Sequence, residues 1–302
     1  VSPGVRATLE GTVHSMSAPT ATPLLARIEI DDLFRTARIF TTASLPPIRA
    51  EATGRLTLED GAVTLAGLKA KVGRSDAQGR LQLRWGGRPR LVADLTSDLI
   101  DARQWEQEEA TQSTALLDHS IPVRELQQAD VQLRLQARRL LLHGYDLANL
   151  RLDGTLDKGL MHLRAHAAEG DLRGNIRFDV RKTPGMAMRI EMDEVEARAL
   201  YTGEMNSGGT SSPRLTMRAQ LAGTGTTLRH MLASSRGGLI VTAGPGRLPV
   251  QAGFGFERMA GNILFVLVPV RRAGELNELE CAAANFTIAN GVATSNDGIV
   301  LR

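Results

Sequence analysis

The stretch RFDVRKTPGMAMRIEMDEV, residues 177–195, contains the pattern that decides the fold. Apolar residues occupy every second position on both sides of a Pro-Gly turn at residues 184–185. Successive side chains of a β-strand point to opposite faces, so this spacing predicts two strands with one apolar and one polar face each. The apolar positions are Phe178, Val180, Met186, Met188, Ile190 and Met192. Such strands need something to cover their apolar face.

The same alternation recurs along the chain and predicts a large sheet. It includes Leu56 and Leu58; Leu81, Leu83 and Trp85; Val131, Leu133 and Leu135; Ile176; and Leu215, Met217, Ala219 and Leu221. The dipeptides Asp60-Gly61, Gly86-Gly87 and Asn290-Gly291 lie between alternating runs, and such dipeptides favour two-residue hairpins. Parallel strands would need long crossovers, for which the spacing leaves no room, so we expect antiparallel pairing.

Two kinds of unit recur in the sequence. Residues 54–65 resemble residues 152–163, and each stretch is followed by a similar run, GRLQLR from Gly79 and GNIRFD from Gly174. A second unit, a strand that leads into a short helix, is predicted in residues 26–40, 93–107, 189–201 and 219–238. The predicted N-caps of these helices are Asp31, Asp101, Asp193 and Thr226. The accretion of one β-module is the simplest interpretation of the first unit.

The last of these short helices should cap the sheet, because its apolar stripe consists of Leu228, Met231 and Leu232. A longer helix is predicted from Phe256 to Val268, and residues 203–212 are the best linker candidate. We therefore expect a mainly β fold: a long twisted antiparallel sheet curled into an apolar groove, with a few short amphipathic capping helices. Residues 1–202 would form a repeated β-groove region, and residues 203–302 a C-terminal β region with two helices that continues the groove.

The composition excludes several classes of protein. The formal net charge is +3, but 36 basic residues are mixed with 33 acidic ones, which is not the basic stripe of a nucleic-acid-binding protein. Cys281 is the one cysteine, so no internal disulfide can form, and we expect its side chain to be buried. The longest apolar run, residues 262–270, is too short to span a bilayer. The chain begins without Met, and we interpret it as an excerpt of a longer protein.

Catalytic and metal-binding motifs are missing from the sequence, so we expect neither an enzyme nor a cofactor or metal site. His162 and His166 lie four residues apart in a predicted strand, roughly 13 Å, which is too far for one metal ion, and we place both on the solvent face. The methionines at 186, 188 and 192 leave two interpretations open, because this flexible side chain fills cores and also adapts to disordered apolar ligands.

Over most of its length the chain resembles the periplasmic part of AsmA-like proteins of Gram-negative bacteria. The resemblance rests on the order and spacing of the alternating runs and turns in residues 52–105, 121–181, 224–241 and 278–302. It implies a body similar to bridge-like lipid transfer proteins, in which phospholipid acyl chains move along a curled sheet. It also implies an inner-membrane anchor helix outside this sequence, a periplasmic location, a role in outer-membrane biogenesis, and no catalytic residues. Envelope protein partners stay undefined.

The alternating positions then become candidate lipid-groove residues. They are Leu56, Leu58, Leu81, Leu83, Leu133, Leu135, Ile176, Phe178, Met186, Met188, Ile190 and Met217, with Leu228, Met231 and Leu232 on the capping helix. Two alternatives stay open. The apolar faces of a structural envelope protein would pack on each other as a closed sandwich without lipid transport. A hydrolase or carbohydrate-binding solenoid is disfavoured by the hairpin turns and by the missing acid–base pair.

Overall fold

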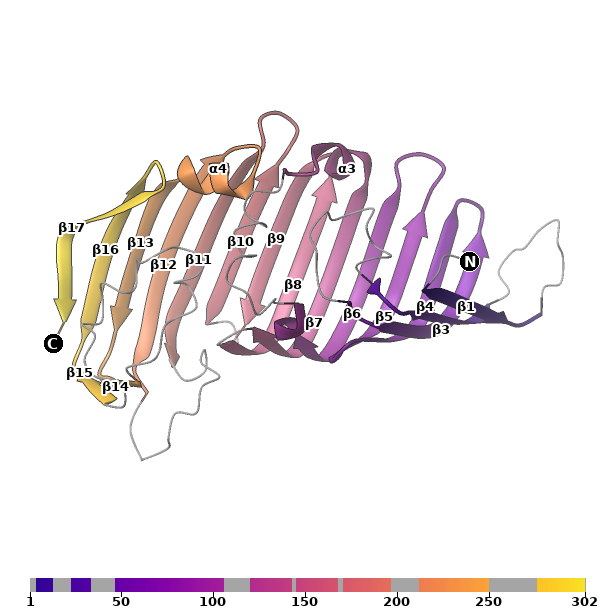
Figure 1. Ribbon diagram of the computed structural model, residues 1–302, viewed down its shortest axis with the longest axis horizontal. Helices are drawn as coiled ribbons and strands as arrows, with labels where there is room; N and C mark the ends of the chain where they lie inside the picture. The colour runs from indigo at the N-terminus through magenta and orange to yellow at the C-terminus, as the bar shows by residue number, and fades with distance from the viewer. Residues whose placement is uncertain are drawn as a thin grey trace.

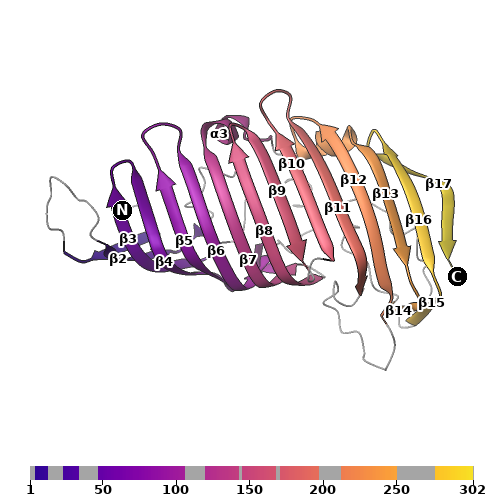
Figure 2. The ribbon, with the colours of Figure 1, turned by 180° about the vertical axis from the view of Figure 1, so that it is seen from behind.

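One open sheet of fifteen strands dominates the computed structural model (Figure 1). The structure describes residues 4–12, 23–33, 47–105, 120–142, 145–167, 171–196, 212–249 and 276–301. The strands follow one another through the sheet in chain order, from β1 at one end to β17 at the other. Seen from behind, the same succession forms one long, twisted layer (Figure 2). The expected mainly β fold with few helices is confirmed.

The strands of the large sheet have the following bounds: β1 Val5–Glu10, β2 Leu24–Ile30, β3 Ala50–Glu59, β4 Ala62–Val72, β5 Ser75–Arg84, β6 Arg90–Asp101, β7 Asp130–Leu142, β8 Tyr145–Asp157, β9 Leu160–Ala167, β10 Leu172–Asp179, β11 Gly185–Glu196, β12 Arg214–Thr224, β13 Arg236–Ala243, β16 Ala282–Ala289 and β17 Val292–Leu301. A separate two-stranded sheet pairs β14 (Gly246–Pro249) with β15 (Leu276–Leu279).

Neighbouring strands of the large sheet are antiparallel except at one place, where β6 and β7 run parallel. The chain between them crosses over through residues 102–129, which include the 3₁₀ helix η1 (Ala102–Trp105) and helix α3 (Val123–Gln128). The expectation of antiparallel pairing throughout is therefore wrong at this junction. Alternation is the same in parallel and antiparallel strands, so it carries no information about strand direction.

The turns follow the sequence signals with two exceptions. The turn expected at Pro184-Gly185 is displaced, because Gly185 begins β11 and pairs with Asp179, so residues 180–184 form the loop. Asp60-Gly61 and Asn290-Gly291 join their strands as two-residue hairpins, since Glu59 pairs with Ala62 and Ala289 with Val292. Both Asn290 and Gly291 have positive φ, 51° and 74°, as a type I′ turn requires. The prediction for Gly86-Gly87 is wrong in length, because Arg84 pairs with Arg90 and residues 85–89 form a five-residue loop.

The two resembling stretches occupy equivalent places in the sheet. Residues 54–65 belong to the β3–β4 hairpin and residues 152–163 to the β8–β9 hairpin. The run that follows each of them is the next antiparallel strand, β5 or β10. Each unit is thus a hairpin plus one strand, which agrees with the repeat read from the sequence.

The short helices differ in detail from the prediction. Helix α4 (Leu228–Ala233) is capped by Thr227, whose hydroxyl accepts from the His230 backbone N–H, and not by Thr226. Asp101 precedes η1 as expected, and its carboxylate accepts from the Arg103 backbone N–H. Asp193 caps no helix within the described residues. Strand β11 continues to Glu196 through a bulge between Met192 and Val195, which returns Val195 to the core.

Several predictions fall on residues that the structure does not describe. They are the helix expected in residues 34–40, residues 197–201 of the helix expected after Asp193, the helix expected from 256 to 268, and residues 203–211 of the linker. Among the described residues, no helix has the length and apolar character needed to cross a membrane.

Candidate functional site

A row of apolar residues crosses the sheet at right angles to the strands. Register partners on neighbouring strands share a face, so the row can be followed from pair to pair. It runs through Leu24, Leu56, Leu65, Leu81, Ala93, Leu133, Gly154, Leu163, Ile176, Met188, Leu221, Gly237, Ile288 and Ala293. We call it the central apolar row. It includes every strand of the large sheet except β1, and no polar side chain interrupts it.

Two parallel rows widen this apolar face. The edge row is displaced by two residues along the strands and comprises Leu58, Val63, Leu83, Leu91, Val131, Leu156, Met161, Phe178, Met186 and Gly223. On the other side, a second row contains Leu68, Leu95, Leu135, Leu152, Ile190, Leu239 and Phe286. Met217 lies further along the same face, opposite Met192 and Val241.

All twelve groove candidates named from the sequence therefore lie on one face of the sheet. Of these, Leu56, Leu81, Leu133, Ile176 and Met188 are in the central apolar row. Many other members of the same face were absent from that set, among them Leu65, Leu91, Leu163, Leu221 and Ile288. Leu163 and Leu221 carried the same alternation as the residues that were chosen, so the signal was available in the sequence.

The apolar face is only half buried over most of its area. Eleven members of the central apolar row, among them Leu81, Leu133 and Met188, are neither fully buried nor fully exposed. Within the part of the chain that the structure describes, no second sheet of comparable size packs on this face. The two methionine interpretations divide accordingly: Met192 belongs to a buried cluster with Val195 and Leu215, whereas Met188 is half buried.

The edge row changes from open to covered along the sheet. On β3, β5 and β6 its members Leu58, Leu83 and Leu91 are 37%, 41% and 36% exposed, and Trp85 beyond them is 48% exposed. On β8 and β10 the residues Leu156 and Phe178 of the same row are 9% and 8% exposed. The N-terminal stretch of the edge row is thus an accessible apolar strip beside the open ends of β3–β6.

Helices α3 and α4 cover the other stretch of the edge row, and Figure 1 shows both along the same long edge of the sheet. Met231 of α4 is fully buried against Phe178 and Val180. Ile121, Val123 and Leu126, just before and within α3, pack against the same cluster. The two segments are joined by a hydrogen bond from the Ile121 N–H to the Thr226 carbonyl and by a bridge between Ser120 and Thr227.

Of the three residues on the expected apolar stripe of α4, Met231 is buried against the sheet. Leu228 is 37% exposed, and Leu232 is half buried. Leu228 is the first residue of a six-residue helix, and a helix of fewer than two turns directs only part of its stripe towards the sheet. Gly223 allows the close approach of α4, since a Cβ at this position would lie 2.1 Å from the Met231 carbonyl oxygen.

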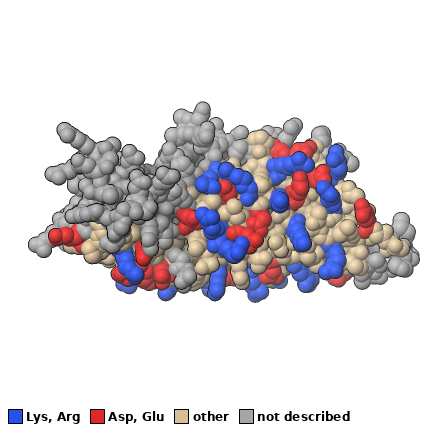
Figure 3. Space-filling view, turned by 90° about the horizontal axis from the view of Figure 1, so that it is seen from below, with Lys and Arg blue, Asp and Glu red and all other residues tan. Residues whose placement is uncertain are grey.

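The opposite face of the sheet is polar and carries mixed charges. Seen from below, at right angles to the view of Figure 1, the described part of the surface carries basic and acidic residues side by side (Figure 3). Many are paired along or between strands, as in Arg138–Asp98 at 2.9 Å and Arg139–Asp146. The Arg181 guanidinium donates two hydrogen bonds to Asp179, at 2.9 and 2.6 Å, and holds the pKa of that carboxyl well below its usual range. Charged side chains are mostly found exposed to solvent, so this face is suited to contact with water.

No cluster of three metal-ligating side chains occurs among the described residues. His162 and His166 are exposed on the polar face, as the alternation predicted. Cys281 is exposed as well, so the expectation of a buried thiol is wrong. It immediately precedes β16 and therefore lies outside the packed part of the strand.

Comparisons of the chain with protein-family models, with curated proteins and with solved structures found no match.

Proposed function

We propose that this chain is the lipid-carrying sheet of an AsmA-like periplasmic protein, and that its apolar face shields phospholipid acyl chains between the inner and outer membranes. One observation carries the proposal: the central apolar row crosses the sheet from β2 to β17 without a polar side chain. With strands about 4.8 Å apart, the row is about 60 Å long. A long acyl chain could pass from strand to strand along it without meeting a charge.

The energetic reason for such a surface is the cost of exposing lipid tails to water. Each CH₂ group removed from water contributes about 0.8 kcal/mol, so an exposed long acyl chain costs on the order of 10 kcal/mol. An uninterrupted apolar face removes that cost without a pocket of defined shape. Large apolar areas on soluble proteins usually serve binding, and the half-buried state of Leu81, Leu133 and Met188 supports a ligand here.

The accessible strip at Leu58, Leu83 and Leu91 supports a route for acyl chains onto the face from the N-terminal half of one long edge. Further along the sheet, α4 and the segment that contains α3 cover the edge row at Phe178. The periplasmic location, the inner-membrane anchor and the role in outer-membrane biogenesis belong to the proposal through the resemblance to AsmA-like proteins. The proposal involves no enzyme activity and no cofactor.

Site-specific photocrosslinking in cells tests the proposal. A photoreactive amino acid replaces Leu81 or Leu133 on the apolar face, and the matched controls carry it at the adjacent Gln82 or Arg134, whose side chains point to the polar face. We expect phospholipid adducts from positions 81 and 133 and few from positions 82 and 134. Equal labelling on both faces, or none, would contradict the proposal and favour a structural envelope protein. Native mass spectrometry of detergent-free protein should show bound phospholipid.

A further inference from the structure

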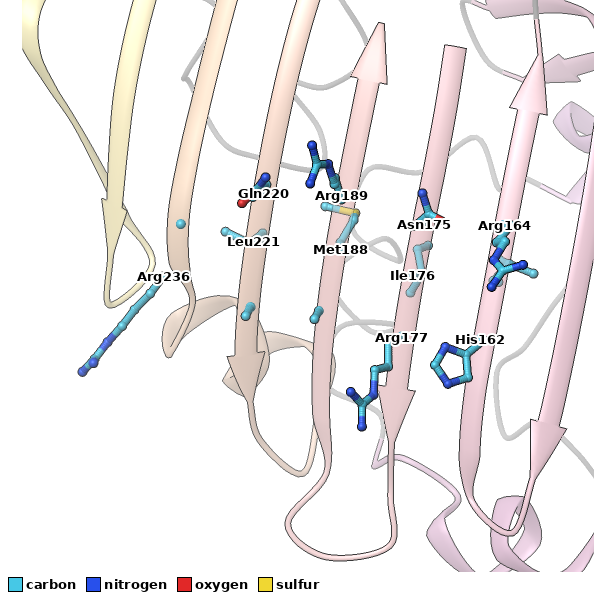
Figure 4. Close-up of a pocket in the computed structure, with 14 residues that line it drawn as sticks. His162, Arg164, Asn175, Ile176, Arg177, Met188, Arg189, Gln220, Leu221 and Arg236 are labelled. Atoms are coloured by element: carbon cyan, nitrogen blue, oxygen red, sulfur yellow. The ribbon is translucent and has the colours of Figure 1, made fainter. Parts of the chain in front are cut away.

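A hollow with several arginines, the basic hollow, lies on the side of the sheet that carries Arg177 and Arg236, although Leu163, Ile176, Met188 and Leu221 of the central apolar row also line it. It has a volume of about 440 Å³ and spans β9 to β13, and an adjoining hollow of about 520 Å³ extends it towards the turn side of β10–β12. The two share Arg177, Ala187, Ala222 and Arg236. Figure 4 shows the side chains of the first hollow on successive strands. A volume of this size accommodates a small-molecule ligand.

The strand register explains why the surface is hollow here. Arg177, Ala187, Ala222 and Arg236 are successive register partners on β10, β11, β12 and β13. Three strand spacings, about 14 Å, separate the two arginine backbones, and two methyl groups form the floor between them. The neighbouring row holds the longer side chains of Asn175, Arg189 and Gln220.

The lining is rich in positive charge that the protein only partly neutralises. Arg189 pairs with Glu191, with its Nε 2.7 Å from the carboxylate. Arg177 reaches Asp179 only at 3.6 Å, and that carboxylate is already held by Arg181. The guanidinium groups of Arg164 and Arg236 make no hydrogen bond or ion pair with other residues in the described ranges.

We infer that this hollow is a binding site for a phosphate group, held between Arg177 and Arg236 above Ala187 and Ala222. A guanidinium presents two parallel N–H donors that match two phosphate oxygens, and such charge-assisted pairs are among the stronger hydrogen bonds. Figure 4 shows the Arg236 side chain extending away from Arg177, and rotation about its side-chain bonds would bring the guanidinium over the alanine floor. Arg164, Arg189 and Asn175 supply further donors on one side.

The shared chemistry is a phosphate ester, which either a small phosphorylated solute or a phospholipid headgroup would provide. The site does not rest on the proposed function, because Arg177 and Arg236 lie on the face opposite the apolar rows. Binding of a phosphate without acyl chains therefore reports on the hollow alone. Lipid adducts at Leu81 and Leu133 report on the apolar face alone.

Isothermal titration calorimetry at low salt tests the inference with inorganic phosphate and glycerol 3-phosphate, and cosedimentation tests it with phosphatidylglycerol vesicles against phosphatidylcholine vesicles. Three variants address the site: Arg177→Gln, Arg236→Gln and Ala222→Leu. The last fills the floor and leaves the charge unchanged. Arg80→Gln is the matched control, because Arg80 is exposed on the polar face of β5, opposite Asp94.

We expect saturable binding by the wild-type chain and by Arg80→Gln, and binding at least about tenfold weaker in each of the three site variants. Binding of the small phosphates would identify a solute, and binding confined to phosphatidylglycerol vesicles would identify a headgroup. Either result supports the site. Absence of binding to all four probes would overturn it, as would an equal loss in Arg80→Gln, since that would reflect net charge and not the hollow.

Discussion

Leu133 of β7 is the register partner of Ala93 of β6 in the one parallel pair among the described strands, and the central apolar row passes through this pair unbroken. Both faces keep their character across the change of strand direction, since Asp94 and Arg134 pair on the polar side of the same junction, at 3.6 Å. The crossover between β6 and β7 therefore changes the topology of the sheet without interrupting the surface proposed to carry lipid.

A charge at this junction should interrupt lipid passage while the fold survives. In Leu133→Asp the carboxylate stands in the central apolar row, half exposed to water, so we expect a loss of about 1–3 kcal/mol in the free energy of unfolding. Leu81 and Met188 lie on opposite sides of the substitution along the row, and lipid crosslinking should decrease at one of them or at both. Chemical denaturation and crosslinking together measure both effects.

The control for this substitution is Gln136→Asp, which places the same side chain on the exposed polar face of the same strand. It should leave crosslinking unchanged. Outright unfolding of Leu133→Asp would indicate a fully packed core at this position, because an unpaired buried charge costs far more than a half-exposed one. That result would favour a closed structure over an open apolar face.

The close packing of α4 against β12 gives a second prediction. In Gly223→Ala the new methyl group would lie 2.1 Å from the Met231 carbonyl oxygen, so α4 has to move away from β12. We expect a destabilisation of about 1–3 kcal/mol, typical of overpacking, and faster hydrogen exchange of the α4 amides. Gly185→Ala is the matched control, because its nearest neighbour would lie at 3.5 Å, an ordinary contact. Equal exchange in both variants would show that α4 is not held by this contact.

Asp101 predicts a specific loss of stability in acid. Its carboxylate is 2% exposed and accepts from Arg103 Nε and a terminal guanidinium nitrogen, both at 2.8 Å, and Arg74 lies 3.1 Å away. The hydrogen bonds from Arg103 lower the pKa of Asp101 below its ordinary value of 3.8. A lowered pKa in the folded state stabilises the fold at pH values above the unfolded pKa, and this contribution disappears as the pH falls through the folded pKa.

We therefore expect Asp101→Asn to be less stable than wild type at neutral pH by about 1–3 kcal/mol. The difference should shrink as the pH is lowered below about 4, because the carboxylate is protonated first in the unfolded chain and then, at still lower pH, in the folded protein. Urea denaturation at a series of pH values measures this convergence. Asp153→Asn, an exposed carboxylate on β8, should show no comparable effect. A stability difference that stays constant down to the lowest pH would contradict the assignment.

The sequence predicts which side chains share a face of this sheet better than it predicts strand direction or the contacts of the covering helices. Alternation assigns Leu56, Leu133, Ile176 and Met188 to one side of their strands, and the register confirms that they form one row. Alternation is a local signal, however, and it cannot specify the parallel β6–β7 pair. The sequence predicts that the helix with Met231 caps the sheet, but the residues it contacts lie far apart in the chain and could not be predicted from a local pattern.

The basic hollow could not be predicted from the sequence, for a related reason. Ala187 and Ala222 are 35 positions apart and become neighbours only through the pairing of β11 with β12. Arg177 and Arg236 flank them for the same reason. An alanine near an arginine is common in any sequence. The hollow can be recognised only when the strand register shows that these alanines and arginines are neighbours.

Trp85 provides a fluorescence test for the accessible strip of the edge row. The sequence has two tryptophans, so a Trp105→Phe variant reports on Trp85 alone, which is 48% exposed beside Leu83. If acyl chains reach the apolar face through this strip, a phospholipid with brominated acyl chains should quench the emission, because bromine quenches an indole that it contacts. The same lipid without bromine is the control and should not quench.

The additional substitution Leu91→Arg places a charge in the strip and should weaken the quenching at a given lipid concentration. Unquenched Trp85 in protein whose position 133 crosslinks lipid would show that acyl chains reach the face by another route.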